Sequence, residues 1–151
     1  MRTRDYHNIK AFCKADDLAV EVYKATRSWP KDEMYGLTSQ VRRAAVSVAC
    51  NIAEGSGRLS DGDFLRFLGI ANGSLRETGY LVHLANRLEY LDQAACDELR
   101  TLHDEASRIL WGLIESIAGR MAGDKLADRV KEDFHSDPPW RLWARSLKSK
   151  V

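Results

Sequence analysis

Apolar residues recur at helical spacing along most of the chain, and no stretch shows the strict apolar–polar alternation of a surface strand. The pattern predicts four helices, at about 9–27, 37–54, 61–90 and 93–121. Only three prolines occur in 151 residues, so long helices are allowed. Because the connections are short, consecutive helices should be antiparallel neighbours. The pattern therefore predicts an all-α fold, an antiparallel up-down four-helix bundle.

Turn and capping residues mark the expected helix ends: Pro30 and Gly36 after the first, Gly55 and Gly57 at the end of the second, Ser60 with Asp63 at the start of the third, and Asp92 before the fourth. The apolar positions predict which side chains face the core: Phe12, Ala15, Ala19, Val22 and Tyr23 in the first helix, Phe64, Phe67, Leu68, Ala71, Leu75, Val82 and Ala85 in the third, and Leu99, Leu102, Ala106, Ile109, Leu113 and Ile117 in the fourth.

The chain divides into a bundle domain at 1–122 and a C-terminal extension at 123–151. The extension starts with a helix-compatible run, is broken by "HSDPPW", and ends in a segment with basic residues and no acid. Arg141, Arg145 and Lys148, beside Trp140 and Trp143, suit a docking segment for RNA or a protein partner. The alternative is that both tryptophans pack on their own subunit or a neighbour.

The second helix carries an unusual stripe of polar residues. At about 100° per residue, six of them fall in one sector, which we call the polar stripe: Gln40, Arg43, Ser47, Asn51, Glu54 and Arg58. Apolar residues lie on both sides of it, with Val41, Ala44 and Val48 on one side and Val46, Ala49, Cys50 and Ala53 on the other. A monomeric bundle needs one apolar side per helix, so the second side predicts contact with another subunit.

Two interpretations of the stripe follow. In the first, Gln40, Ser47, Asn51 and Glu54 form a structural polar seam with Ser74 and Glu77 of the third helix, and Arg43 pairs with a glutamate. Loss of one member of such a buried pair would cost about 3–5 kcal/mol. In the second, Arg42, Arg43 and Arg58 line a groove that binds an anion or a nucleic-acid backbone.

The stretch "YGLTSQVRRAAVSVACNIAEGSGRLSDGDFLRFLGIANGSLRET", residues 35–78, resembles the rRNA intervening-sequence protein family, also called four-helix bundle proteins. The resemblance extends over about residues 9–120. It implies a small four-helix subunit assembled into a ring, typically a pentamer. It also implies a link to accessory subunits of reverse transcriptases in diversity-generating retroelements, where the ring holds enzyme and RNA.

Catalytic and metal-binding patterns are absent from the sequence. The four histidines are scattered, no Glu-x-x-His pair suits a di-iron bundle, and there is no Walker loop or G-x-S-x-G motif. We therefore expect no enzyme activity, no metal and no cofactor.

Charge and composition limit the remaining classes. The net charge of +1 confines any nucleic-acid contact to local patches. No apolar run is long enough for a membrane span, no signal peptide is recognisable, and three distant cysteines fit reduced thiols, so we expect a cytoplasmic protein. The sequence predicts a homo-oligomeric adaptor that binds RNA or DNA weakly, without strong sequence preference, and a reverse transcriptase as a further partner. The alternative is a structural homo-oligomer that binds only protein.

Overall fold

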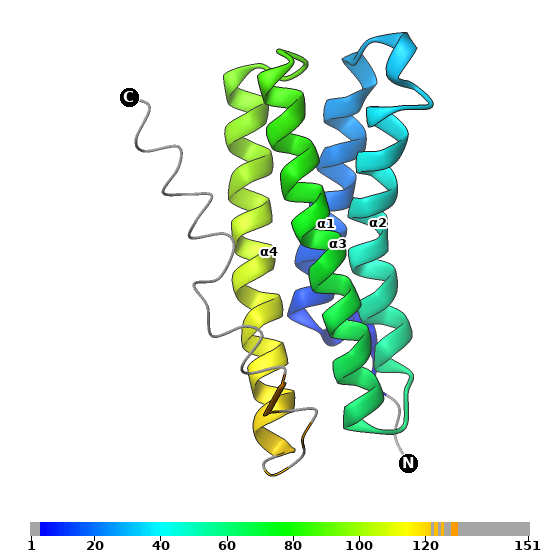
Figure 1. The fold of residues 1–151 in the computed structure, drawn as a ribbon, viewed down its shortest axis with the longest axis vertical. Coiled ribbons are helices and arrows are strands. Elements are labelled where there is room, and N and C mark those ends of the chain that lie inside the picture. Colours follow the sequence, from blue (N-terminus) through cyan, green and yellow to red (C-terminus); the bar gives the residue numbers. More distant parts are fainter. Residues whose placement is uncertain (1–3, 122, 124, 126–127, 130–151) are drawn as a thin grey trace.

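The computed structural model describes residues 4–121, 123, 125 and 128–129. Four α-helices run through this part of the chain: α1 (Lys10–Ala25), α2 (Leu37–Ser56), α3 (Asp61–Arg87) and α4 (Gln93–Arg120). Short 3-10 helices flank α1 at Tyr6–Asn8 and Thr26–Ser28, and a third precedes α2 at Lys31–Glu33. The predicted all-α four-helix bundle is confirmed (Figure 1).

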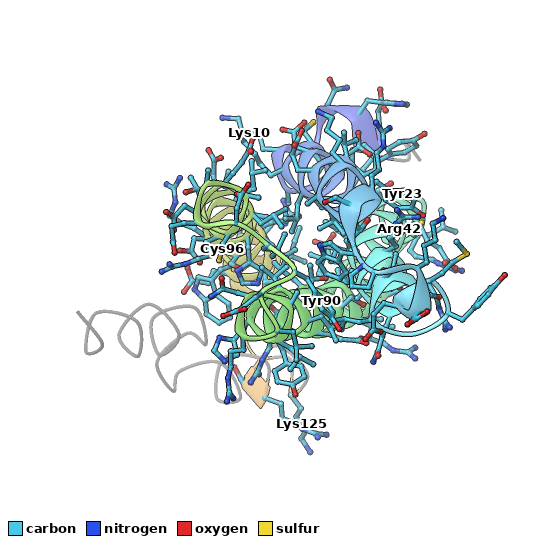
Figure 2. The ribbon with its side chains drawn as sticks, turned by 90° about the horizontal axis from the view of Figure 1, so that it is seen from above. Lys10, Tyr23, Arg42, Tyr90, Cys96 and Lys125 are labelled. Atoms are coloured by element: carbon cyan, nitrogen blue, oxygen red, sulfur yellow. The ribbon has the colours of Figure 1, made fainter. Side chains whose placement is uncertain are left out.

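Sequential helices lie side by side in a square arrangement. α2 contacts α1 and α3, α4 contacts α3 and α1, and the α2–α3 contact is the most extensive. Each helix therefore packs against two neighbours and leaves an outer face, as the view along the bundle in Figure 2 shows. Within the described residues, no helix is long and apolar enough to cross a membrane.

The predicted caps at α3 and α4 are confirmed. The Asp63 backbone N–H donates to Ser60 Oγ at 3.0 Å, and the Ala95 N–H donates to Asp92 Oδ1 at 2.7 Å. At α2 the cap is not adjacent in sequence, because Glu33 Oε2 accepts from the Leu37 N–H at 2.8 Å. A negative carboxylate thus occupies the positive end of the α2 dipole.

Tyr23, expected in the core, is 45% exposed, and the expectation was wrong at this position. Phe12, Phe67, Leu102, Ile109 and Leu113 are only partly buried. The centre of the bundle instead includes side chains that the pattern did not select: Leu18, Leu65, Leu110 and Ile114. Because each helix touches two neighbours, its buried sector is wide, and its midpoint depends on how the helices pack.

Gly55 does not end α2 as predicted, since the helix continues through Ser56. A Cβ at Gly55 would lie 2.6 Å from Cβ of Phe67 and 3.0 Å from a ring carbon of Phe64. The glycine therefore allows close approach of α2 and α3. Gly79 has a similar role on α3, since a Cβ there would lie 2.7 Å from Nε2 of His103. That nitrogen lies 3.0 Å from the Leu75 carbonyl, which satisfies a buried imidazole.

Candidate functional site

The residues of the polar stripe fall into three groups, which differ in the side chains that they contact. In the middle, Ser47 and Ser74 hydroxyls are 2.9 Å apart and link α2 to α3. The Asn51 amide donates to the Ser47 carbonyl at 2.8 Å and to its hydroxyl at 3.1 Å. Of the expected seam, the structure joins these three half-buried residues only.

Glu54 pairs with Arg58 one helical turn away, and not with Arg43. Their side chains are 57% and 44% exposed, and the Arg58 guanidinium lies over the Phe67 ring, 4.6 Å from its centroid. Exposed i,i+4 pairs contribute only about 0–1 kcal/mol. The cost expected for loss of a buried charge pair therefore does not apply to Glu54 within this subunit.

Arg42 is held on the opposite side of α2. Its Nε donates to Oγ1 of Thr26 at 2.8 Å, and its guanidinium lies 4.7 Å from the centroid of the Tyr23 ring (Figure 2). Arg42 and Arg58 are 16 residues apart, or about 24 Å along the helix axis. The second interpretation of the stripe placed Arg42 and Arg58 in one groove, and the structure does not bring these two residues together.

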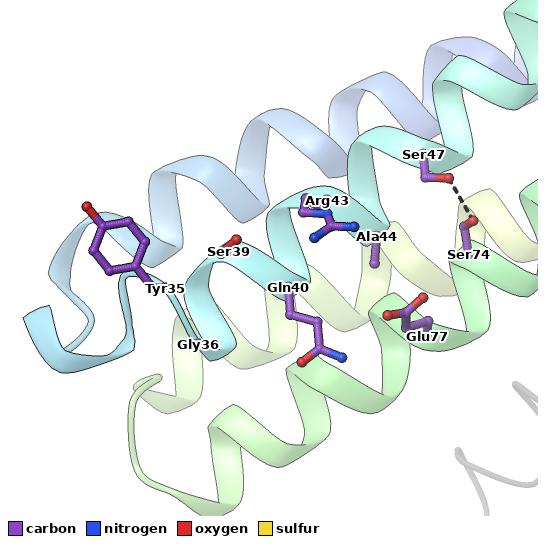
Figure 3. Close-up of a pocket in the computed structure, with 9 residues that line it drawn as sticks. All are labelled: Tyr35, Gly36, Ser39, Gln40, Arg43, Ala44, Ser47, Ser74 and Glu77. Atoms are coloured by element: carbon purple, nitrogen blue, oxygen red, sulfur yellow. Dashed lines mark hydrogen bonds between the residues drawn. The ribbon is translucent and has the colours of Figure 1, made fainter.

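A polar groove lies at the first half of α2, where α2 faces the second half of α3. It has a volume of about 490 Å³ and is lined by Tyr35, Gly36, Ser39, Gln40, Arg43, Ala44, Ser47, Ser74 and Glu77. Gln40, Arg43 and Glu77 surround the space between the two helices (Figure 3). We call this feature the α2–α3 groove.

Arg43 and Glu77 are both exposed, and neither makes a hydrogen bond or ion pair with another described residue. The expected Arg–Glu pair across the seam is therefore not formed within the subunit. Tyr35, at the end of the groove, is 94% exposed. Tyr35 and Ser39 were not predicted as site residues from the sequence, although an aromatic residue in a loop before a helix is a recognisable signal.

The second apolar side of α2 is narrower than predicted. Ala49 is 8% exposed and belongs to the subunit's own core, and Ala53 is half-buried. Val46, at 37%, and Cys50 remain exposed. Arg43, Val46 and Cys50 are spaced i, i+3 and i+7 and so share one face of the helix.

Two groups with raised pKa values, the buried Cys96 and the half-buried Tyr90, lie in other parts of the bundle. Burial raises the pKa of the Cys96 thiol on α4. Burial and the hydrogen bond to Glu33 raise the pKa of Tyr90, whose hydroxyl donates to Glu33 Oε1 at 3.1 Å. Among the described residues, no group of three His, Cys, Asp or Glu side chains is placed to hold a metal ion. Arg141, Arg145 and Lys148, with both tryptophans of the extension, lie outside the described residues.

Comparison with solved structures supports the fold. The chain is similar to a protein of unknown function of the S23 ribosomal protein family from Bacteroides thetaiotaomicron, solved at 1.70 Å resolution. The TM-score is 0.62 at 25% sequence identity, over 69% of this chain and 97% of that chain. No curated protein matches the chain.

Comparison with protein families gives a match over most of the bundle. The model of the 23S rRNA-intervening sequence proteins matches residues 7–112, which include the groove and the whole of α2 and α3. Since this match covers more than half of the sequence, the chain belongs to the 23S rRNA-intervening sequence protein family.

Proposed function

We propose that this protein is a non-enzymatic, oligomeric adaptor that associates with RNA or DNA. The observation that carries the proposal is the outer face of α2. It presents the guanidinium of Arg43, which pairs with no described residue, beside two exposed apolar side chains, Val46 and Cys50. The apolar part suits contact with a second copy of the chain, and the free cation suits contact with an anionic polymer. Membership in a family named for rRNA-intervening sequences agrees with a nucleic-acid partner.

Assembly would multiply a small basic surface. One subunit has a net charge of only +1, but closed symmetry repeats each arginine once per copy. Arg58 adds a second basic position beyond the other end of α2, because a guanidinium that stacks on Phe67 and pairs through one nitrogen keeps other N–H groups free for phosphate oxygens. Arg42 contributes less, since Thr26 and Tyr23 already engage it.

The specific form of the assembly stays a prediction from the resemblance. A ring, typically a pentamer, and a reverse transcriptase partner are both expected on that ground. The competing function is a structural homo-oligomer with protein partners only. Absence of nucleic-acid binding in a protein that still assembles would favour this competing function.

The test combines assembly with salt-dependent binding. Light scattering at micromolar concentration should report several subunits rather than one of 17.1 kDa. Fluorescence anisotropy with labelled single-stranded RNA and DNA should show weak binding at 50 mM salt that is lost before about 500 mM, because phosphate contacts release counterions. Removal of residues 138–151 should weaken binding without dissociating the oligomer.

Arg43→Gln should weaken binding of all sequences, whereas Arg108→Gln, a matched exposed arginine on α4, should not. A monomer, or an oligomer that retains neither RNA nor DNA at low salt, would refute the adaptor in its nucleic-acid form.

A further inference from the structure

The α2–α3 groove holds two opposite charges that have no partner among the described residues of the subunit. Close by, Ser47 forms hydrogen bonds with Ser74 and Asn51, so polar side chains of α2 and α3 do pair where they come within reach of each other. Arg43 and Glu77 nevertheless face the same space from α2 and α3 with no ion pair between them (Figure 3). A ligand with acceptors for the Arg43 guanidinium and donors for the Glu77 carboxylate would satisfy the hydrogen-bonding groups of both side chains.

A simple anion does not fit this arrangement. A free phosphate inside the groove would lie beside the Glu77 carboxylate, which would repel it, whereas a backbone phosphate on the outer face of α2 can contact the exposed Arg43 without entering the groove. The helix N-terminus beside the groove offers no anion site either, since the Glu33 carboxylate already accepts from the Leu37 N–H. A neutral group with donors and acceptors on adjacent edges fits better, and a nucleobase is such a group.

Among the four RNA bases, guanine uses both charged groups fully. Its N1–H and N2–H are adjacent donors that one carboxylate can accept together, and its O6 and N7 are adjacent acceptors for one guanidinium. Adenine, cytosine and uracil each lack the two neighbouring ring and amino donors that would engage both carboxylate oxygens.

Tyr35 supplies a surface for the flat face of a base. It lies at the end of the groove and is 94% exposed, and its ring points away from Gln40, Arg43 and Glu77 in Figure 3, so it must turn inward to stack on a base held by the groove. Base–aromatic stacking of this kind is common where proteins bind single-stranded nucleic acid. The groove volume of about 490 Å³ also lies in the range of small-molecule sites.

We propose that the α2–α3 groove binds an unpaired guanine, with Glu77 accepting from its Watson–Crick edge, Arg43 donating to O6 and N7, and the exposed Tyr35 turning inward to stack on the ring. This inference rests on the proposed function, because it assigns a base preference to nucleic acid that phosphate contacts alone would bind without preference. It requires a single strand, since pairing would occupy the Watson–Crick edge that Glu77 needs.

The test compares single-stranded RNA 12-mers that differ only in the atoms the groove contacts. One contains guanine in a uridine background, a second has inosine in its place, which lacks the N2 donor, and a third is all uridine. Anisotropy at 50 mM salt should give a dissociation constant for the guanine strand roughly tenfold lower than for the inosine strand.

Glu77→Gln should remove most of that guanine preference and leave binding of the uridine strand unchanged or slightly stronger, because a negative charge is lost. Arg43→Lys keeps the charge but loses two-pronged donation, so it should reduce the preference while general affinity is retained. Glu115→Gln and Arg108→Lys make the same chemical changes at exposed positions on α4 and should have no effect.

The outcomes separate this inference from the proposed function. If the wild type binds all three strands equally, the guanine site is refuted and the adaptor stands. If no strand binds, both fail. If Glu77→Gln or Arg43→Lys dissociates the oligomer in light scattering, the two charges pair across a subunit interface, and the guanine site is again refuted.

Discussion

Single residues in this bundle differ mainly in whether a neighbouring helix reaches them. Two arginines of α2 and one just after its end illustrate this. Arg42 contacts Tyr23 of α1 and Thr26 of the 3-10 helix that follows it, and the Arg58 guanidinium lies over Phe67 of α3. Arg43 makes no such contact with a described residue of another element. The same holds for the cysteines, of which Cys13 and Cys50 are exposed and Cys96 is buried.

The thiols provide a test at this scale. In a Cys50→Ser variant at pH 8, Cys13 should react quickly with a disulfide reagent and Cys96 only when the protein unfolds. Access is one reason, and the raised pKa of Cys96 is the second, because it lowers the reactive thiolate fraction at any pH below that pKa. Two fast thiols in the folded Cys50→Ser variant would contradict the burial of Cys96.

At the scale of helices, the glycines of α2 and α3 have different roles despite similar sequence surroundings. Gly55 lies against Phe67 and Phe64, so an added methyl group has no space. Gly69 and Gly73, on α3, have no atom within 4 Å of an added Cβ. Since glycine is a poor helix former, Gly69 only weakens its helix within the subunit.

A matched pair of substitutions tests this difference. Gly55→Ala should lower the free energy of unfolding by about 1–3 kcal/mol through overpacking. Gly69→Ala should raise it by about 0.5–1 kcal/mol through helix propensity. Urea denaturation at one fixed protein concentration measures both. A destabilised or dissociated Gly69→Ala protein would show instead that another chain approaches α3 at this glycine.

At the scale of the whole molecule, assembly is proposed to use the outer face of α2. Val46→Lys should dissociate the oligomer, because a charge would enter an apolar contact, while circular dichroism remains helical. Val20→Lys is the matched control, since Val20 on α1 is 46% exposed and lies on a different helix. If both variants assemble like the parent in light scattering, α2 is not the contact face.

The number, order and approximate ends of the helices followed from local features. Apolar spacing, the Ser60 and Asp92 caps and short connections act within a few residues, and the structure confirms all of them. The core list was less accurate, because Leu18 and Leu110 are buried and Tyr23 is exposed. Local spacing defines an apolar sector, but two neighbouring helices decide its midpoint.

The sequence by itself determined that this protein is a four-helix bundle whose second helix carries polar residues in one sector, since both depend on spacing along a single helix. Only the tertiary structure decided which of those residues have partners. Ser47 is satisfied by Ser74, Arg42 by Thr26, and Arg43 by no described residue, since each partner comes from another element of the fold. The α2–α3 groove exists for the same physical reason, because facing residues of two helices do not meet until the helices pack.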